Sequence, residues 1–268
     1  MKNRIALVGG GRMGGAMLRG WAPLADQIDL VVCDPFPSPE VNEIVSAKGW
    51  LLNPDPAAGA KFDCVVLGIK PQVFATVADQ TVKHLIGENT VVLSIMAGIG
   101  TAKIVEHTHA PHVVRAMPNT PGQIGKGVTA YWCSPTVPTP TEELAKSLLR
   151  PLGLVEKLQS EKQIDVVTAV SGSGPAYVFL LAEAMAAAGE AEGLERALAE
   201  RLAWQTVIGA AALMEETGQT PQELRRAVTS PEGTTAAATD VLTAGGGIVS
   251  LVRRAVETAI HRARQLGK

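Results

Sequence analysis

Cysteine and aromatic side chains are scarce in this chain of 268 residues. Phe, Trp and Tyr together make up 4% of it, and the three cysteines, Cys33, Cys64 and Cys133, lie far apart and form no C-x-x-C pair. An odd number of isolated cysteines argues against a disulfide framework. We therefore expect reduced thiols in a protein core, as is typical of a cytoplasmic protein.

Long apolar runs and an excess of one charge are missing as well. Only the apolar residues 5–8 follow Met1–Arg4, too few for the core of a signal peptide, and no uninterrupted apolar run has the length of a membrane span. Lys and Arg number 24 and Asp and Glu 26, a net charge of −2, and the basic residues are scattered. We expect no nucleic acid and no membrane among the partners.

The second half of the chain has few proton donors. Residues 163–267 contain no lysine and no cysteine, one histidine (His261) and one tyrosine (Tyr177). An enzyme that reduces a ketone needs an acid to protonate the forming alkoxide, whereas a protonated imine already carries the positive charge that favours hydride addition. If this half binds a substrate, its composition favours reduction of a C=N bond.

The most informative feature that is present is the glycine-rich segment 9–14, which directly follows the apolar run 5–8. Its G-x-G-x-x-G spacing falls on Gly9, Gly11 and Gly14, between an expected strand and an expected helix. There the glycines permit a tight turn, close approach to a pyrophosphate and packing of helix on strand. Asp34 ends the next apolar run, twenty residues past Gly14, where a Rossmann unit places its ribose-binding carboxylate. The alternative is a structural turn that holds no ligand.

Strands and helices are expected to alternate through the first half. Apolar runs predict strands at 5–8, 30–33, 62–69, 90–95, 112–116, 127–132 and 154–157, with helices from 13 and at 41–47, 77–85, 99–108 and 141–149. Such alternation with short connections is typical of a doubly wound, parallel α/β sheet. The sequence therefore predicts a Rossmann-type dinucleotide-binding domain over residues 1–160.

Residues 161–268 are expected to form an all-α domain for dimerisation and substrate binding. Residues 163–268 contain no strand pattern, 177–188 are nearly all apolar, and 198–214 carry few charges. Helices that are apolar around most of their circumference need cover on several sides. We expect that cover to come from a second copy of the chain, in a homodimer or a higher homo-oligomer.

Three loops follow the carboxyl ends of expected strands, where open α/β sheets bind ligands. They are 68–71, 96–98 and 115–121, and Lys70 and Asn119 are candidates for contact with cofactor or substrate. A further candidate is 228–236, an expected helix start whose free backbone N–H groups suit a carboxylate. For each segment the alternative is an ordinary loop or cap without a ligand.

Two other patterns are rejected as sites. A nucleophile elbow around Ser173 would need glycine at position 171, which is Ser171, and no strand precedes it. The histidines at 107, 109 and 112 match no standard spacing of metal ligands. We expect no metal.

Taken together, five segments resemble the pyrroline-5-carboxylate reductase family. They are the glycine-rich segment, Lys70-Pro71-Gln72, Met117–Pro121, Ser171–Tyr177 and Thr229–Thr235, in this order over nearly the whole chain. The resemblance implies reduction of 1-pyrroline-5-carboxylate to L-proline by NADPH or NADH, the last step of proline biosynthesis. It also implies an N-terminal Rossmann domain and a C-terminal helical dimerisation domain, with dimers often assembling into larger rings.

The resemblance also implies the residues of the site. The expected cofactor contacts are Gly9, Gly11, Arg12, Met13, Gly14, Asp34, Asn53, Ile69, Lys70, Pro71, Ala97, Gly98 and Asn119. The expected substrate contacts are Ser230, Gly233, Thr234 and Thr235. Thr235 is expected to be the catalytic residue, hydrogen-bonded to the ring nitrogen, with Ser230 and Thr234 at the carboxylate.

Two positions depart from the family pattern. Glu232 stands where family members commonly have the first of two glycines, and its charge would repel an anionic substrate unless it points away. Asp34 would accept hydrogen bonds from both ribose hydroxyls of NADH and repel the 2′-phosphate of NADPH, with no Arg or Lys before Lys48 to offset it. Arg12, in the glycine-rich segment, either swings toward a 2′-phosphate or points to solvent, and we expect it to point to solvent. We expect NADH to be used at least as well as NADPH.

Other functions remain open from the sequence. A β-hydroxyacid dehydrogenase or a related imine reductase shares the layout, but the hydroxyacid enzymes use a catalytic lysine on the interdomain helix, which is missing here. A protein that senses dinucleotides without catalysis belongs to a different class. Turnover with an imine, turnover with a hydroxyacid, and binding without turnover distinguish the three.

Overall fold

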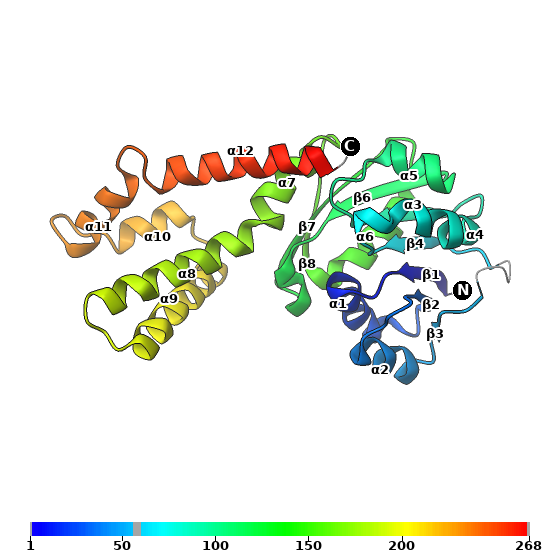
Figure 1. The fold of residues 1–268 in the computed structure, drawn as a ribbon, viewed down its shortest axis with the longest axis horizontal. Coiled ribbons are helices and arrows are strands. Elements are labelled where there is room, and N and C mark those ends of the chain that lie inside the picture. Colours follow the sequence, from blue (N-terminus) through cyan, green and yellow to red (C-terminus); the bar gives the residue numbers. More distant parts are fainter. Residues whose placement is uncertain (1, 56–59, 267–268) are drawn as a thin grey trace. The chain divides into compact units, whose positions relative to one another are not determined.

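A computed structural model describes residues 2–55 and 60–266 (Figure 1). Met1 and residues 267–268, at the ends of the two predicted domains, lie outside the described residues. By its contacts the chain divides into two compact units, residues 1–172 together with 259–268, and residues 173–258. The predicted division at residue 160 stays a prediction, and each unit is described by itself.

The first unit is built on an eight-stranded sheet in the order β3-β2-β1-β4-β5-β6-β7-β8. Its strands are β1 (Asn3–Val8), β2 (Ile28–Cys33), β3 (Leu51–Leu52), β4 (Cys64–Leu67), β5 (Val91–Ser94), β6 (His112–Met117), β7 (Gly127–Cys133) and β8 (Gly153–Lys157). Every pair is parallel except β6 with β7, which are antiparallel. Only residues 118–126 join these two strands, too short a connection for the crossover that a parallel pair needs.

Helices cover both faces of this sheet, as expected of a doubly wound fold. They are α1 (Arg12–Trp21), α2 (Pro39–Ala47), α3 (Phe74–Val77), α4 (Lys83–Leu85), α5 (Thr101–Thr108), α6 (Thr139–Leu149) and α7 (Gln163–Val167). Apolar residues of α1, α2 and α6 pack on one face of the strands, and those of α3 and α5 on the other. The strands read as continuous apolar runs because both faces are buried. The predicted α/β fold class is thus confirmed.

The second unit is helical throughout. Its helices are α8 (Gly174–Ala191), α9 (Arg196–Thr217), α10 (Pro221–Ala227), α11 (Thr234–Thr243) and α12 (Ile248–Leu266), the last turns of α12 belonging to the first unit. Large apolar side chains on α8 and α9 are exposed, among them Phe179, Leu180 and Ile208. The helical stretch Gln163–Ala191 has the length and hydropathy of a membrane span by composition alone, and 11% of its most apolar part is buried within this chain.

Candidate active site

The turn between β1 and α1 has the shape of a phosphate cradle. A Cβ atom on Gly14 would lie 2.1 Å from the carbonyl oxygen of Gly9, so only glycine allows helix and turn to meet this closely. A Cβ on Gly11 would meet nothing within 4 Å, so open space lies above that backbone. Gly11 is the N-cap of α1, and within the described chain no side chain caps this end of the helix. The residues therefore fit the diphosphate of a dinucleotide.

Asp34 lies just beyond β2, beside this cradle, and its carboxylate contacts the backbone. Its Oδ2 atom accepts a hydrogen bond of 2.6 Å from the N–H of Gly10, and its Oδ1 atom one of 2.8 Å from the N–H of Phe36. A carboxylate offers about four acceptor positions, so both oxygens keep capacity for ribose hydroxyls. The aspartate thus joins the glycine-rich turn to the loop after β2.

Asn53, which directly follows β3, the neighbour of β2 in the sheet, holds Asp34 in place. Its side-chain Nδ2 donates to the carbonyl of Asp34 at 2.7 Å, and its Oδ1 accepts from the N–H of Asp34 at 2.8 Å. Asn53 has a φ of 48°, a left-handed conformation that asparagine tolerates better than most residues. The side-chain amide of the predicted cofactor residue Asn53 therefore positions Asp34.

A cavity of about 450 Å³ opens at the carboxyl ends of the strands beside Asp34 and Asn53. We call it the Asp34–Asn53 cavity; it is also lined by Val8, Gly9, Cys33 and Ile69. Burial raises the pKa of the Cys33 thiol to about 11, so the thiol is protonated at neutral pH. A second cavity of about 430 Å³, lined by Asn3, Asp63 and Glu143, lies at the amino ends of the strands, the edge where doubly wound sheets do not bind ligands.

Of the other predicted cofactor residues, Arg12 and Met13 are the first two residues of α1, and the rest lie in the loops after β4, β5 and β6. Lys70, which is exposed, and Pro71 begin a short 3₁₀ turn after β4. Gly98, after β5, has a φ of 79° in the loop it shares with Ala97. Asn119 accepts a hydrogen bond of 2.9 Å from the N–H of Val128 through Oδ1, so that side chain fixes the turn into β7.

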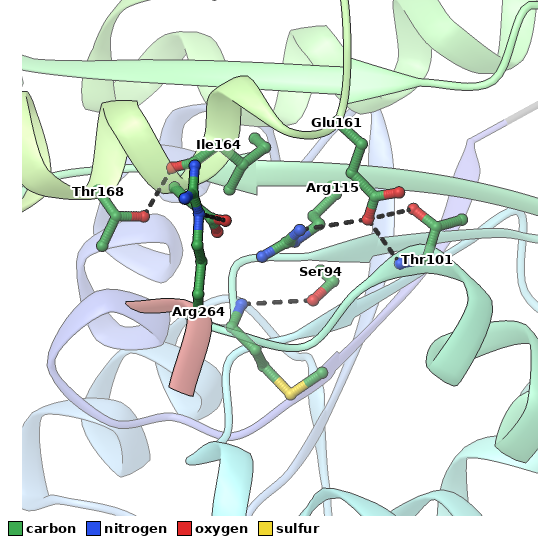
Figure 2. Close-up of polar contacts among 9 residues, drawn as sticks. Ser94, Thr101, Arg115, Glu161, Ile164, Thr168 and Arg264 are labelled. Carbon is green, nitrogen blue, oxygen red and sulfur yellow. Dashed lines mark hydrogen bonds and ion pairs between the residues drawn. The ribbon is translucent and has the colours of Figure 1, made fainter. Parts of the chain in front are cut away.

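A buried arginine supports the loop after β5, a role that no pattern in the sequence indicates. Arg115 in β6 donates to Glu161 Oε1 at 3.2 Å, and the same oxygen accepts from the N–H and the hydroxyl of Thr101, at the start of α5 (Figure 2). The Arg115 side chain is 6% exposed, and its Nε atom has no hydrogen-bond partner. Figure 2 shows the guanidinium pointing at the glutamate, which precedes α7. The pair therefore ties the end of the loop that holds Ala97 and Gly98 to the segment leading out of the sheet.

The predicted substrate residues belong to the second unit. Thr234 and Thr235 are the first residues of α11, and Gly233 is its N-cap. A Cβ on Gly233 would lie 2.4 Å from the Ser230 hydroxyl oxygen, so glycine suits this position. Within the described chain no side chain caps this helix, so its first N–H groups remain available to an anion. Glu232 has a φ of 59°, the left-handed region that favours glycine.

The structure brings together only part of the predicted site. The residues expected at the cofactor lie in the first unit and Ser230, Gly233, Thr234 and Thr235 in the second. Among residues 2–55 and 60–266, no group of His, Cys, Asp and Glu side chains could hold a metal. Ser171 and Gly172 lie in a π-helical turn, and Ser171 donates its hydroxyl to the carbonyl of Val167.

A doubly wound sheet with a glycine cradle at β1, an aspartate after β2 and a separate helical unit defines a nicotinamide-dinucleotide-dependent oxidoreductase. Residues 4–98 match the family model "NADP oxidoreductase coenzyme F420-dependent", and residues 161–266 match "Pyrroline-5-carboxylate reductase dimerisation".

Full-length relatives agree with these matches. Pyrroline-5-carboxylate reductase from Pseudomonas aeruginosa is 38% identical over 99% of this chain and 97% of its own. The structure of a pyrroline-5-carboxylate reductase from Coxiella burnetii covers 100% of both chains at 35% identity, with a TM-score of 0.89. The Plasmodium falciparum pyrroline carboxylate reductase with NADP bound has a TM-score of 0.80 at 26% identity, over 99% of this chain and 98% of its own. This chain belongs to the pyrroline-5-carboxylate reductase family.

Proposed function

We propose that the chain reduces the C=N bond of 1-pyrroline-5-carboxylate with NADPH or NADH to give L-proline, the final step of proline biosynthesis. The observation that carries this most directly is the glycine cradle with Asp34 beside it, in a chain that matches the reductases from end to end. The chain is accordingly an oxidoreductase that acts on a cyclic imine with a nicotinamide cofactor.

In this proposal the first unit binds the cofactor. The N–H groups at the start of α1 bind the diphosphate, Asp34 binds the adenosine ribose, and the loops at Ile69–Pro71 and Ala97–Gly98 border the nicotinamide half. When bound, the cofactor supplies the hydride that adds to the imine carbon. The role of these two loops in the proposal is to hold the nicotinamide ring in place for this hydride transfer.

The start of α11 is proposed to hold the substrate. The N–H groups of Thr234 and Thr235, at the uncapped start of α11, suit its carboxylate together with the Ser230 hydroxyl, because a helix N-terminus favours an anion. The Thr235 hydroxyl hydrogen-bonds the ring nitrogen and orients the C=N bond. The scarcity of acids in residues 163–267 is compatible with this chemistry, since the hydride adds to the imine carbon and the nitrogen of a protonated imine already carries its proton.

We infer that NADH is used at least as well as NADPH. The Asp34 carboxylate accepts hydrogen bonds from the 2′- and 3′-hydroxyls of NADH, and it would face the 2′-phosphate of NADPH at close range. Hydrogen bonds from Gly10 and Phe36 and the amide of Asn53 keep it at that place. The Plasmodium falciparum relative was solved with NADP, so the preference is a proposal about this chain alone.

The exposed apolar helices support a homo-oligomer built on the second unit. Phe179, Leu180, Leu202 and Ile208 are each more than half exposed on α8 and α9 of a single chain. Apolar surface of this extent normally faces a partner. We propose that a second copy covers it in a cytoplasmic homodimer or a larger homo-oligomer, and that each active site draws on both chains.

An absorbance assay tests the proposed reaction against the alternatives. The purified protein is mixed with NADH or NADPH and with 1-pyrroline-5-carboxylate, or with a panel of 2- and 3-hydroxyacids and their keto forms. Oxidation of the cofactor with the imine, together with formation of proline, supports the proposal. Turnover with a hydroxyacid pair alone, or cofactor binding without any turnover, contradicts it.

A further inference from the structure

A third cavity also borders Asp34, apart from the Asp34–Asn53 cavity, and two arginines line it. It measures about 320 Å³ and is lined by Arg12 and Arg19 of α1 and by Ser38 and Glu40 at the start of α2. Asp34 lines both cavities and so stands between them. We call this one the arginine cavity.

The position of Asp34 indicates what the arginine cavity faces. The carboxylate after the second strand of a Rossmann unit lies at the 2′-hydroxyl of the adenosine ribose. A phosphate on that hydroxyl would emerge at Asp34, and the nucleoside itself would fill the Asp34–Asn53 cavity. The arginine cavity is therefore the space next to the carboxylate that remains for a 2′-phosphate.

The two arginines are placed to meet such a phosphate. Arg12 and Arg19 are seven residues apart in α1, about two turns, so both side chains leave the same face of the helix. Gly15, between them, also lines the cavity and adds no side chain to fill it. The start of α2, capped by Ser38, borders the same space.

The carboxylate of Glu40, at the edge of the arginine cavity, forms an ion pair with one of the two arginines, Arg19. Glu40, in the first turn of α2, forms an ion pair with Arg19 through Oε1 and NH1. The side chains are 53% and 36% exposed, so the pair can open without unfolding anything. Glu40 therefore lowers the positive charge that Arg19 offers to the cavity and adds a second negative charge beside Asp34.

We propose that Glu40 is a specificity-determining residue. By forming an ion pair with Arg19, it weakens the binding of a 2′-phosphate in the arginine cavity. This inference rests on the dinucleotide site of the proposed function and names the residue that tunes it. Asp34 attracts the unphosphorylated ribose and repels a 2′-phosphate, and the Glu40–Arg19 pair adds to the discrimination against the phosphorylated cofactor. Removing the Glu40 charge releases Arg19 toward the phosphate.

Binding of two small probes tests this without any turnover. Dissociation constants for adenosine 2′,5′-bisphosphate and for 5′-AMP are measured by calorimetry on the full chain and on Glu40→Gln. The substitution is expected to tighten the bisphosphate about fivefold or more and to leave 5′-AMP within about twofold, because only the 2′-phosphate gains a cation. The ratio of kcat/KM for NADPH to that for NADH is expected to rise by the same factor.

Three further variants make the test specific. Glu43→Gln removes the same charge from the same helix outside the cavity and should change neither ratio. Glu40→Lys should exceed Glu40→Gln, and the gain should shrink at high salt as exposed charges are screened. Adding Arg19→Gln to Glu40→Gln should abolish the gain.

The proposal is overturned if Glu40→Gln leaves both probes unchanged, if Glu43→Gln gives the same gain, or if the gain survives the loss of Arg19. Because neither probe is reduced, a chain that bound them as expected but did not reduce the imine would refute only the proposed reaction. A chain that reduced the imine with an unmoved cofactor ratio in Glu40→Gln would refute only this inference.

Discussion

The side-chain amide of Asn53 pairs with both backbone groups of Asp34, donating to its carbonyl at 2.7 Å and accepting from its N–H at 2.8 Å. Two residues that are nineteen positions apart are thus joined by a pair of hydrogen bonds at the carboxyl end of β2. The aspartate side chain in turn accepts from the N–H of Gly10 in the glycine-rich turn. The carboxylate that we propose as the ribose ligand is therefore fixed in place before any cofactor binds, which lowers the ordering cost of binding.

Replacing Asp34 by serine is expected to shift the cofactor preference toward NADPH. The substitution removes the acceptors for both ribose hydroxyls and the repulsion of a 2′-phosphate. A net change near 1.4 kcal/mol, about tenfold, is expected in the ratio of kcat/KM for the two cofactors. Steady-state kinetics on the native protein and on Asp34→Ser measure it. A tenfold advantage of NADPH in the native protein, or an unmoved ratio in the variant, would show that Asp34 does not select the cofactor.

Replacing Thr235 by alanine is expected to lower kcat/KM for the imine by about 10- to 150-fold, because a hydrogen bond to a charged group contributes roughly 1.5–3 kcal/mol. Thr235→Ser should retain most of the activity, since it keeps the hydroxyl. Thr243→Ala is the matched control in the same helix, where the hydroxyl donates to the carbonyl of Thr239. Unchanged kinetics in a folded Thr235→Ala protein would remove this residue from the mechanism.

Replacing Glu232 by glycine is expected to raise both stability and substrate affinity. A non-glycine residue in the left-handed region costs about 1 kcal/mol, and the φ of Glu232 is 59°. Glycine relieves that strain and removes a negative charge next to the proposed carboxylate site. The denaturation midpoint should therefore rise and KM for the imine should fall. Glu232→Ala removes the charge but keeps the strained backbone, so its KM should fall without the gain in stability; a midpoint that does not rise in Glu232→Gly would contradict the strain argument.

The apolar surface of α8 and α9 is expected to make the dimer obligate, with an interface of well over about 2,000 Å². Placing glutamates at Phe179 and Ile208, which are 61% and 60% exposed, should produce monomers that are inactive. A glutamate at Val105 of α5, also exposed, serves as the control and should leave the assembly intact. Light scattering at micromolar concentration measures both. A native chain that is a stable, active monomer would contradict the expectation.

The parts of the fold that depend on neighbours in sequence were predictable. The continuous apolar strands and the glycines at 9, 11 and 14 specify the β1–α1 turn locally, and Asp34 follows from the length of one βα unit. The parallel sheet expected from the sequence is wrong for β7: the apolar run 127–132 encodes no direction by itself, and the signal that could have shown the antiparallel pairing is the short connection from the expected strand 112–116. The two-residue strand β3 is too short to leave any periodic pattern.

The contacts that position the site were harder to find because they join distant elements. The ion pair of Arg115 with Glu161 links β6 to the segment before α7, 46 residues away. Along the chain, Lys48 is the first cation after Asp34, and Arg12 is the cation within the glycine-rich segment. Arg19 is not expected near Asp34 from the sequence, because it reaches the arginine cavity only once α1 packs beside α2. Tertiary packing, rather than spacing in sequence, determines these pairs.

The fate of a deuterium label tests the central claim most directly. The protein is supplied with 1-pyrroline-5-carboxylate and with NADH or NADPH that carries deuterium at both positions of nicotinamide C4, and the product is analysed by mass spectrometry and NMR. The account predicts L-proline that carries a single deuterium on the ring carbon that had been the imine carbon, with the cofactor oxidised in equal amount. Absence of proline from a folded protein that binds the cofactor, or proline without the label, would contradict it.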